Sequence, residues 1–317
     1  MNLKLLAAFA AICLLAVPAT VVGQPDVDLP QSLPQTKDRL SSERMEGLVR
    51  GPIEIVQSQG LETGKAAFER LLARTRARHG ARSVEVADLF ESFGVGLYLL
   101  GMDSDDGFKA ASIPYLEAAV PAYRAAFGDA HPEVAVALNS LADAQAALSE
   151  GDPPQSVDAA LEEAYRIRLN ALGPRNIETL ANLRNLARLR GLPSRTRGDR
   201  ARIEAAAELF RRLVANSADD PELGLESAPH AFAAFARMYA RNGMAAEARA
   251  QLRLGIEHAR TWGEPDRCVF AATETANVEE ILAGKAEGGG DNLFSLDAIA
   301  RCMTPDDEAA PEQVTVT

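Results

Sequence analysis

The stretch "FGDAHPEVAVALNSLADAQ" (residues 127–145) decides the fold of this 317-residue chain. It begins with a glycine-led turn and continues with apolar residues three and four positions apart, which is the spacing of one helix face. Pro132 suits the first position of a helix because its missing N–H would have no intrahelical partner there. Glu133 places a carboxylate near the positive end of the helix dipole. The stretch therefore predicts a turn that leads directly into an α-helix.

Similar stretches occur on both sides of it. "GARSVEVADLFESFG" begins at Gly80 and "GPRNIETLANLRNLA" begins at Gly173, and each has a glutamate five residues after its glycine. These helices share a small residue at one position, and a fourth helix fits the same pattern: Gly94, Ala142, Ala187 and Ala236. Each of these helices is followed by a second segment whose apolar residues also have helical spacing. Hairpins of this kind must stack to bury their apolar faces, so the sequence predicts an all-α array of antiparallel helical hairpins.

The composition is that of a helical, globular protein, with 47% hydrophobic, 25% charged and 5% aromatic residues. The net charge of −12 argues against binding to nucleic acid. The sequence contains no motif of a catalytic nucleophile or a phosphate-binding loop, and its four histidines lack the spacing of a helical metal pair. We therefore predict no enzyme activity, no cofactor and no metal site. An enzyme or enzyme-associated repeat domain whose active site no motif reveals remains an alternative.

The N-terminus has the features of a secretory signal. An apolar run follows Lys4, and small residues allow cleavage after Ala19 or after Gly23. Pro18 interrupts this run, which is short for a membrane span, although a retained anchor stays open. We predict export across the inner membrane to the periplasm, with no membrane insertion after cleavage.

The rest of the chain divides by composition. The predicted parts are a signal peptide (1–23), a Pro/Gln-rich linker (24–40), helical repeats (41–262), a C-terminal helical cap (263–303) and a disordered tail (304–317). Cys268 and Cys302 both lie in the cap. Two cysteines in an exported chain favour one disulfide, and two buried free thiols are the alternative. The disulfide would hold the cap on the open end of the array.

The stretch "FARMYARNGMAAEARAQLRLG" (residues 235–255) resembles the tetratricopeptide repeat (TPR) family in its small, aromatic and turn positions. The turn-led form around Gly128 and Gly173 is similar to the kinesin-light-chain type of this repeat. The resemblance covers residues 60–260, with Gln145 and Arg190 in place of the family's aromatic residue. It implies a right-handed α-solenoid that acts as a non-catalytic scaffold. Such a scaffold would bind a protein or peptide in a concave groove lined by the first helix of each hairpin.

The resemblance also implies which side chains line that groove. The matching positions are Asn139, Asp143, Arg184, Asn185, Arg188, Arg237 and Arg241. Arginines four residues apart share one helix face, and Glu91 is expected on the equivalent surface of an earlier hairpin. The groove is therefore predicted to become basic toward its C-terminal half and to bind an acidic segment or a free C-terminus. Alternatively, the arginines are solvated or pair with Glu204, Glu208 and other acids. A separate alternative for the function is a structural subunit of an envelope assembly.

Overall fold

The computed structural model describes residues 42–102, 107–149, 153–192 and 200–284. The predicted signal peptide, linker and C-terminal tail lie outside these ranges, as does Cys302. All elements within the described ranges are α-helices or short 3-10 helices, which confirms the all-α prediction. The chain divides into two compact units, Met1–Ser149 (unit 1) and Glu150–Thr317 (unit 2).

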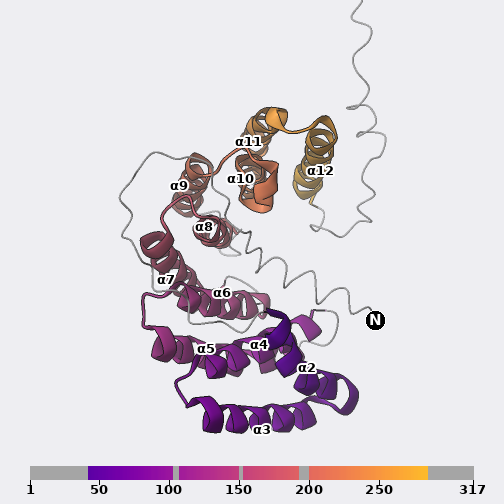
Figure 1. Ribbon diagram of the computed structural model, residues 1–317. Helices are drawn as coiled ribbons and strands as arrows, with labels where there is room; N and C mark the ends of the chain where they lie inside the picture. Colours follow the sequence, from indigo (N-terminus) through magenta and orange to yellow (C-terminus); the bar gives the residue numbers. More distant parts are fainter. Residues whose placement is uncertain (1–41, 103–106, 150–152, 193–199, 285–317) are drawn as a thin grey trace, which may run out of the picture. The chain divides into compact units, whose positions relative to one another are not determined.

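Unit 1 is built from consecutive helical hairpins. Its helices in the described ranges are α2 (Ser42–Gln59), α3 (Leu61–His79), α4 (Val84–Leu100), α5 (Gly107–Phe127) and α6 (Pro132–Ala147). α2 packs against α3, α4 packs against α5, and α6 continues the stack on α5 (Figure 1). α2 also packs on α4, and α4 contacts α6. The first helices of successive hairpins are therefore neighbours, as the repeated sequence pattern predicts.

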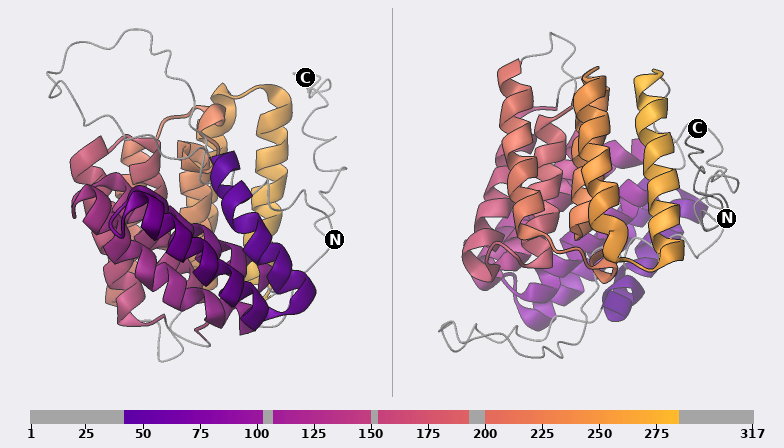
Figure 2. Two further views of the ribbon diagram at one scale, coloured as in Figure 1. Left: turned by 60° about the horizontal axis from the view of Figure 1, so that its bottom comes forward. Right: turned by 90° about the horizontal axis from the view of Figure 1, so that it is seen from above.

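Unit 2 repeats this arrangement. Its described elements are α7 (Gln155–Leu172), α8 (Ile177–Arg190), α9 (Arg200–Asn216), η1 (Pro221–Glu226), α10 (Ala228–Arg241), α11 (Ala245–His258), η2 (Ala259–Thr261) and α12 (Glu264–Leu282). α8 packs against α7 and α9, and α10 packs against α9 and α11. α12, the start of the predicted cap, lies along α10 and α11 and is drawn in yellow in Figure 2.

The predicted helix starts are confirmed in both units. The glycines at the three turns all have a positive φ: Gly80 (94°), Gly128 (92°) and Gly173 (83°). Only the left-handed region that favours glycine has such values. At the start of α6, the Glu133 N–H donates to Nδ1 of His131 (3.3 Å). At the start of α8, the Glu178 N–H donates to Oδ1 of Asn176 (2.9 Å). His131 and Asn176 are thus equivalent N-caps in successive repeats.

The predicted small positions lie where helices approach most closely. A Cβ added to Gly94 would lie 2.7 Å from Cγ of Leu116 on α5. The corresponding alanines are almost completely buried: Ala142, Ala187 and Ala236. Larger side chains at these positions would force neighbouring helices apart, so the periodic small residues set the spacing within each hairpin.

An aromatic cluster forms the centre of unit 1. The rings of Phe68 on α3 and Phe93 on α4 are fully buried and stack with their centroids 4.3 Å apart. The Tyr115 ring on α5 meets Phe93 edge-on at 4.8 Å. Three helices from two hairpins therefore meet in one packed contact, which is the kind of interface that holds stacked repeats together.

Two glycines in the first hairpin test this packing. A Cβ added to Gly64 would lie 2.1 Å from Cγ2 of Val56 and 2.9 Å from the Pro52 carbonyl oxygen, whereas one added to Gly51 meets nothing within 4 Å. We expect Gly64→Ala to lower the free energy of unfolding by about 1–3 kcal/mol. Gly51→Ala should raise it by about 0.5–1 kcal/mol, because alanine is the better helix former. Urea denaturation of both variants measures this, and equal effects would contradict the α2–α3 contact.

Candidate functional site

The predicted groove residues fall on first helices of both units. Asn139 and Asp143 lie on α6 of unit 1, where both are half-buried. The others lie on two neighbouring helices of unit 2: Arg184, Asn185 and Arg188 on α8, and Arg237 and Arg241 on α10. The ends of these two helices are joined by a hydrogen bond from the Asn242 amide to the Gly191 carbonyl (2.9 Å). The surface that α8 and α10 share in unit 2 is therefore the candidate site.

Arg184 forms an ion pair on this surface. Its Nη2 lies 3.0 Å from Oε1 of Glu226, the last residue of η1, and both side chains are largely buried. Burial raises the pKa of the Glu226 carboxyl, and the charge of Arg184 lowers it in part. The 3-10 turn between α9 and α10, which the sequence pattern did not predict, thus supplies a carboxylate to a predicted binding residue.

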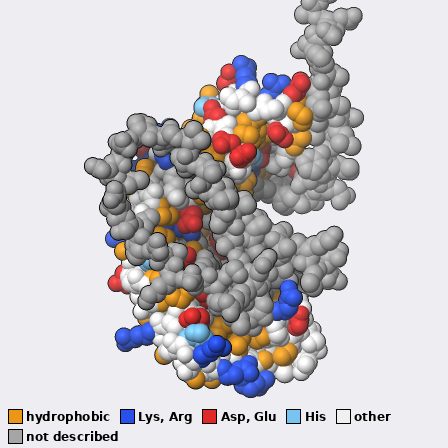
Figure 3. Space-filling model, viewed as in Figure 1, with side chains coloured by type: hydrophobic (Ala, Val, Ile, Leu, Met, Phe, Trp, Pro, Cys, Tyr) orange, Lys and Arg blue, Asp and Glu red, His pale blue; other side chains and the backbone are white. Residues whose placement is uncertain are grey.

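Arg237 also has a carboxylate partner. Its Nη1 donates to Oε2 of Glu274 on α12, and the two side chains are 18% and 10% exposed. Because both charges are mostly removed from water, the pair joins α10 to α12 as part of the packed structure. Figure 3 shows acidic as well as basic side chains on the visible surface of the α10–α12 region.

The remaining groove residues are more accessible. Arg188 is exposed, and it has no ion pair within the described residues. Asn185 and Arg241 are half-buried. Arg190, at the end of α8, donates to both carboxylate oxygens of Asp158 (2.7 and 3.0 Å), which raises its pKa. Of the predicted arginines on α8, Arg188 is therefore the one whose guanidinium is available to a ligand.

The expectation for Glu91 was wrong. Its side chain is 7% exposed, and its carboxylate accepts hydrogen bonds from the Tyr123 hydroxyl (2.6 Å) and the Ser140 hydroxyl (3.3 Å). Asp88 lies beside it, with Oδ1 2.7 Å from the same Tyr123 hydroxyl. A helix position one residue from a groove position can point inward, and the polar network between α4, α5 and α6 holds Glu91 there.

The alternative that the groove arginines pair with acids holds for Arg184 and Arg237, although their partners are not Glu204 or Glu208. Glu204 and Glu208 pair with Arg211 of the same helix, α9, at 2.7 and 3.0 Å. The predicted groove arginines instead use acids from η1 and α12. Pairing within α9 follows from the short sequence separation, whereas the pairs of α8 and α10 depend on how the helices pack.

A buried Ser–His contact lies at the start of α10. Ser227 Oγ lies 2.9 Å from Nδ1 of His230, an arrangement that can indicate a nucleophile and its base. However, Ser227 is fully buried and its hydroxyl donates to the Gly224 carbonyl (2.8 Å). The Ser227 hydroxyl therefore lies between the Gly224 carbonyl and the imidazole, and it is removed from solvent.

Two histidines make the stability depend on pH. Burial lowers the pKa of His131, and burial is also the largest cause of the lowered pKa of His230. The unfolded chain takes up these protons near pH 6.5, so stability should fall as the pH drops below that value and level off once the folded form is protonated. Each histidine contributes at most about 1.4 kcal/mol per pH unit.

The His131→Asn variant isolates one of these contributions. Asparagine is an effective N-cap that does not titrate, and Asn176 already occupies the equivalent position in the next repeat. Urea denaturation at pH 7.5 and 5.5 should show a smaller loss of stability in the variant than in the unmodified protein. An equal loss in both proteins would mean that folding does not lower the pKa of His131.

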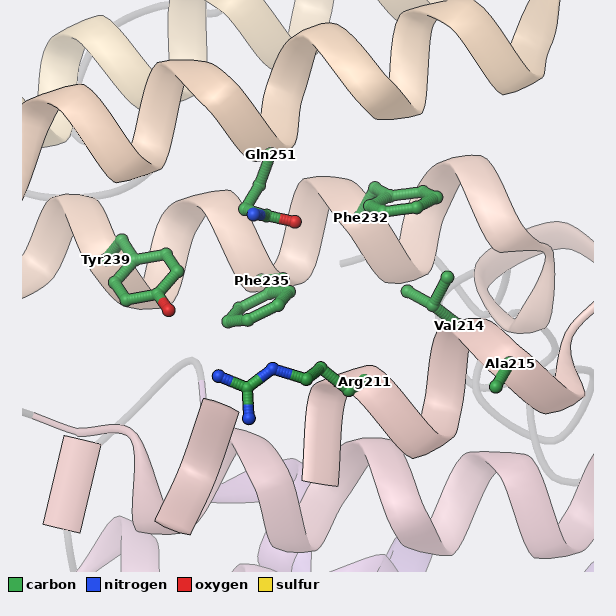
Figure 4. Close-up of a pocket in the computed structure, with 7 residues that line it drawn as sticks. All are labelled: Arg211, Val214, Ala215, Phe232, Phe235, Tyr239 and Gln251. Carbon is green, nitrogen blue, oxygen red and sulfur yellow. The ribbon is translucent and has the colours of Figure 1, made fainter. Parts of the chain in front are cut away.

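A pocket on another surface of unit 2 was missed by the sequence reasoning. It has a volume of about 270 Å³ and lies between α9, α10 and α11 (Figure 4). Its lining residues are Arg211, Val214, Ala215, Phe232, Phe235, Tyr239 and Gln251. The aromatic residues were recognised only as repeat positions, and the pocket exists because three helices bring them together.

The described residues show neither a metal site nor a membrane span. No group of three or more histidine, cysteine, aspartate or glutamate side chains there could hold a metal ion. None of the described helices is long and apolar enough to cross a membrane.

Stacked helical hairpins with small residues at their contacts and glycine-led, N-capped turns define a helical-repeat protein of the TPR-like kind. No protein-family model matches the chain, and no curated protein matches it in sequence. Two crystal structures of nearly identical TPR-like repeats of the kinesin-light-chain type, from Podosopora anserina, are similar to it with a TM-score of 0.51. They are 19% and 18% identical, cover 69% of this chain, and are themselves covered to 97% and 95%. The similarity confirms the TPR-like repeat fold.

Proposed function

We propose that this chain is a non-catalytic scaffold that binds a peptide or protein segment on the surface of α8 and α10. The observation that supports this is the TPR-like fold, with the exposed Arg188 and the half-buried Asn185 side chains on the first helix of a hairpin. A guanidinium matches a carboxylate in shape and charge, so the proposed ligand is an acidic segment or a free C-terminus. A pre-formed helical surface limits the ordering cost of binding.

Because Arg184 is in an ion pair and Arg188 is exposed, a substitution of Arg188 gives the clearer test of the proposal. Arg184→Glu would place two carboxylates together at Glu226 and would destabilise unit 2, so loss of binding would be ambiguous. Arg188→Glu changes an exposed side chain and should leave the free energy of unfolding within about 0.5 kcal/mol. Arg253→Glu is the matched control because it makes the same charge change at an exposed position of α11, a second helix.

The experiment is an affinity capture from the native envelope fraction with the unmodified protein, Arg188→Glu and Arg253→Glu. A protein retained by the first and third and lost by the second supports the proposed surface. A partner held equally by all three would place the interaction elsewhere. No retained partner at all would contradict the scaffold proposal.

We also propose that the chain is exported. The supporting feature is the N-terminal sequence, with an apolar run after Lys4 and small residues at Ala19 and Gly23. Mass spectrometry of the protein from periplasmic and membrane fractions tests this. A mature N-terminus at residue 20 or 24 in the periplasmic fraction is expected, and an intact N-terminus in the membrane fraction would instead establish a retained anchor.

A disulfide between Cys268 and Cys302 is part of this proposal. Cys268 is completely buried in α12, and Cys302 lies outside the described residues. An oxidising compartment favours the bond, which typically contributes about 2–4 kcal/mol. Peptide mapping without reduction should recover a cross-linked peptide containing both cysteines, and alkylation of both thiols in the unreduced, unfolded protein would contradict the bond.

A further inference from the structure

His230 lies where α10 meets α12. Its ring meets the Phe270 ring of α12 edge-on, with the two centroids 5.0 Å apart, and it contacts the Trp262 ring at 5.5 Å. Phe270 and Trp262 are buried and contact each other at 5.2 Å. On its other side, Nδ1 of His230 lies 2.9 Å from the Ser227 hydroxyl oxygen. A titratable ring is therefore part of the aromatic contact that joins α10 to α12.

An ion pair joins the same two helices further along α10. Arg237 of α10 pairs with Glu274 of α12, and both side chains are mostly buried. The pair that joins α11 to α12, Arg249 and Glu279 (2.7 Å), is exposed, so solvent screens its charges. Of these interactions that fix α12, the two made with α10 are therefore the ones removed from water.

The charges that act on His230 come from three helices. Glu274 of α12 favours a protonated ring, whereas Arg237 of α10 and Arg184 of α8 oppose it. Arg184 is itself paired with Glu226 of η1 (3.0 Å). Burial is the largest cause of the lowered pKa of His230, so the ring is neutral in the packed state near pH 7. A proton on the ring would add a positive charge near two guanidinium groups, in a contact that is largely shielded from water.

The opposite side of α12 faces solvent. Val269 is 40% exposed, and Thr275 and Ala276 are exposed as well. Figure 2 shows α12, in yellow, at the edge of the described part of unit 2. A helix that is packed from one side opens at a lower free energy than one packed between two neighbours. α12 can therefore separate from α10 without displacing another described helix.

The separated state binds a proton more readily than the packed state. Once α12 has moved away, the His230 ring is solvated and its pKa returns to about 6.5, which is above its lowered value in the packed state. The packed contact therefore has its full stability above about pH 6.5 and loses stability as the pH falls, until the packed ring is protonated too. Over this range the equilibrium constant for opening can rise by at most about tenfold per pH unit.

We infer that the contact between α10 and α12 is an acid-sensitive latch, in which protonation of His230 releases α12 while the rest of unit 2 stays folded. The release exposes the apolar surfaces of Phe270 and Trp262. It also separates Glu274 from Arg237, which makes that guanidinium accessible. Because Arg237 is a predicted groove residue, acid would enlarge the binding surface on α10. This last consequence, unlike the release itself, rests on the proposed function.

Trp262 reports on the latch because it is the only tryptophan in the sequence. Acrylamide quenching of its fluorescence measures the exposure of the indole ring in the full-length protein. The quenching constant should rise at least about twofold between pH 7.5 and pH 5.5, while circular dichroism retains most of the helical signal. A constant that does not rise, or a rise that accompanies loss of most of the helical signal, would overturn the inference.

Two histidine variants identify the group that responds to pH. His230→Phe keeps a ring against Phe270 and Trp262 but cannot be protonated, so its quenching constant should not depend on pH. His258→Gln is the matched control, because His258 pairs with Asp219 (2.8 Å), whose carbonyl accepts a hydrogen bond from the Trp262 N–H (2.8 Å). This control should respond as the unmodified protein does. A response that persists in His230→Phe, or that is lost in His258→Gln, would contradict the role of His230.

An NMR titration gives a test that needs no variant. The His230 ring should titrate with an apparent pKa below about 6.5. The methyl groups of Val278, which is completely buried on α12, should shift with the same midpoint, whereas those of Leu213, completely buried on α9, should not. A His230 pKa at or above about 6.5, or equal shifts on both helices, would show that no acid-sensitive latch exists.

Discussion

Phe93→Ala should lower the free energy of unfolding of unit 1 by about 3–5 kcal/mol, the largest loss expected from any single substitution proposed for this protein. The ring is completely buried and touches Phe68 at 4.3 Å and Tyr115 at 4.8 Å. Its removal leaves a cavity where two hairpins meet. Because repeat proteins are stabilised by contacts between neighbouring repeats, the loss should be felt in α3, α4 and α5 together.

Urea denaturation and hydrogen exchange measure this effect. Amide protection should fall most in α3 to α5, and the matched substitution Arg70→Ala, at an exposed position of α3, should change the free energy of unfolding by less than about 0.5 kcal/mol. Phe93→Leu keeps much of the apolar volume and should cost less than alanine. A loss below about 1 kcal/mol for Phe93→Ala would show that the aromatic cluster does not hold the two hairpins together.

Glu274→Ala should destabilise unit 2 by about 3 kcal/mol, because it removes a carboxylate that pairs with the mostly buried Arg237 guanidinium. The exposed pair of Arg249 and Glu279 also joins α12 to its neighbour. Glu279→Ala should cost less than about 1 kcal/mol, since solvent screens both charges. The two variants thus compare a buried and an exposed ion pair at the same helix.

A double-mutant cycle distinguishes the structural role of Arg237 from its predicted binding role. Arg237→Met and Glu274→Met should each destabilise unit 2, and the double variant should recover much of the loss because no uncompensated charge remains. Thermal and urea denaturation of the four proteins give the coupling free energy. If Arg237→Met left stability unchanged, the side chain would be free to serve a ligand, as the sequence resemblance implied.

Prediction from sequence succeeds for features that depend on residues close together in the chain. The turns at Gly128 and Gly173 and the caps that follow are decided by residues within a few positions of one another, so the sequence pattern predicted the start of each helix correctly. Phe93 directly precedes Gly94, one of the small residues predicted at helix contacts. Its ring partners, Phe68 and Tyr115, come from other helices, and periodicity does not specify them.

The candidate site was predicted less completely for the same reason. The sequence placed Arg184, Asn185 and Arg188 on one helix, and the structure agrees. It did not reveal that η1 supplies Glu226 to Arg184 or that α12 supplies Glu274 to Arg237. An ion pair between elements depends on the path of the chain between them, and no local pattern encodes that path.

The sequence by itself determined the helical class, the repeated glycine-led turns and the small residues at helix contacts, because each depends on backbone conformation or helical periodicity over a short stretch. Only the tertiary structure decided which of the charged side chains predicted for the groove remain available to a ligand. It buried Glu91, paired Arg184 and Arg237 within unit 2, and left Arg188 exposed. It also formed the aromatic pocket from α9, α10 and α11. These features require side chains from several helices to come together, and packing, not local sequence, sets those distances.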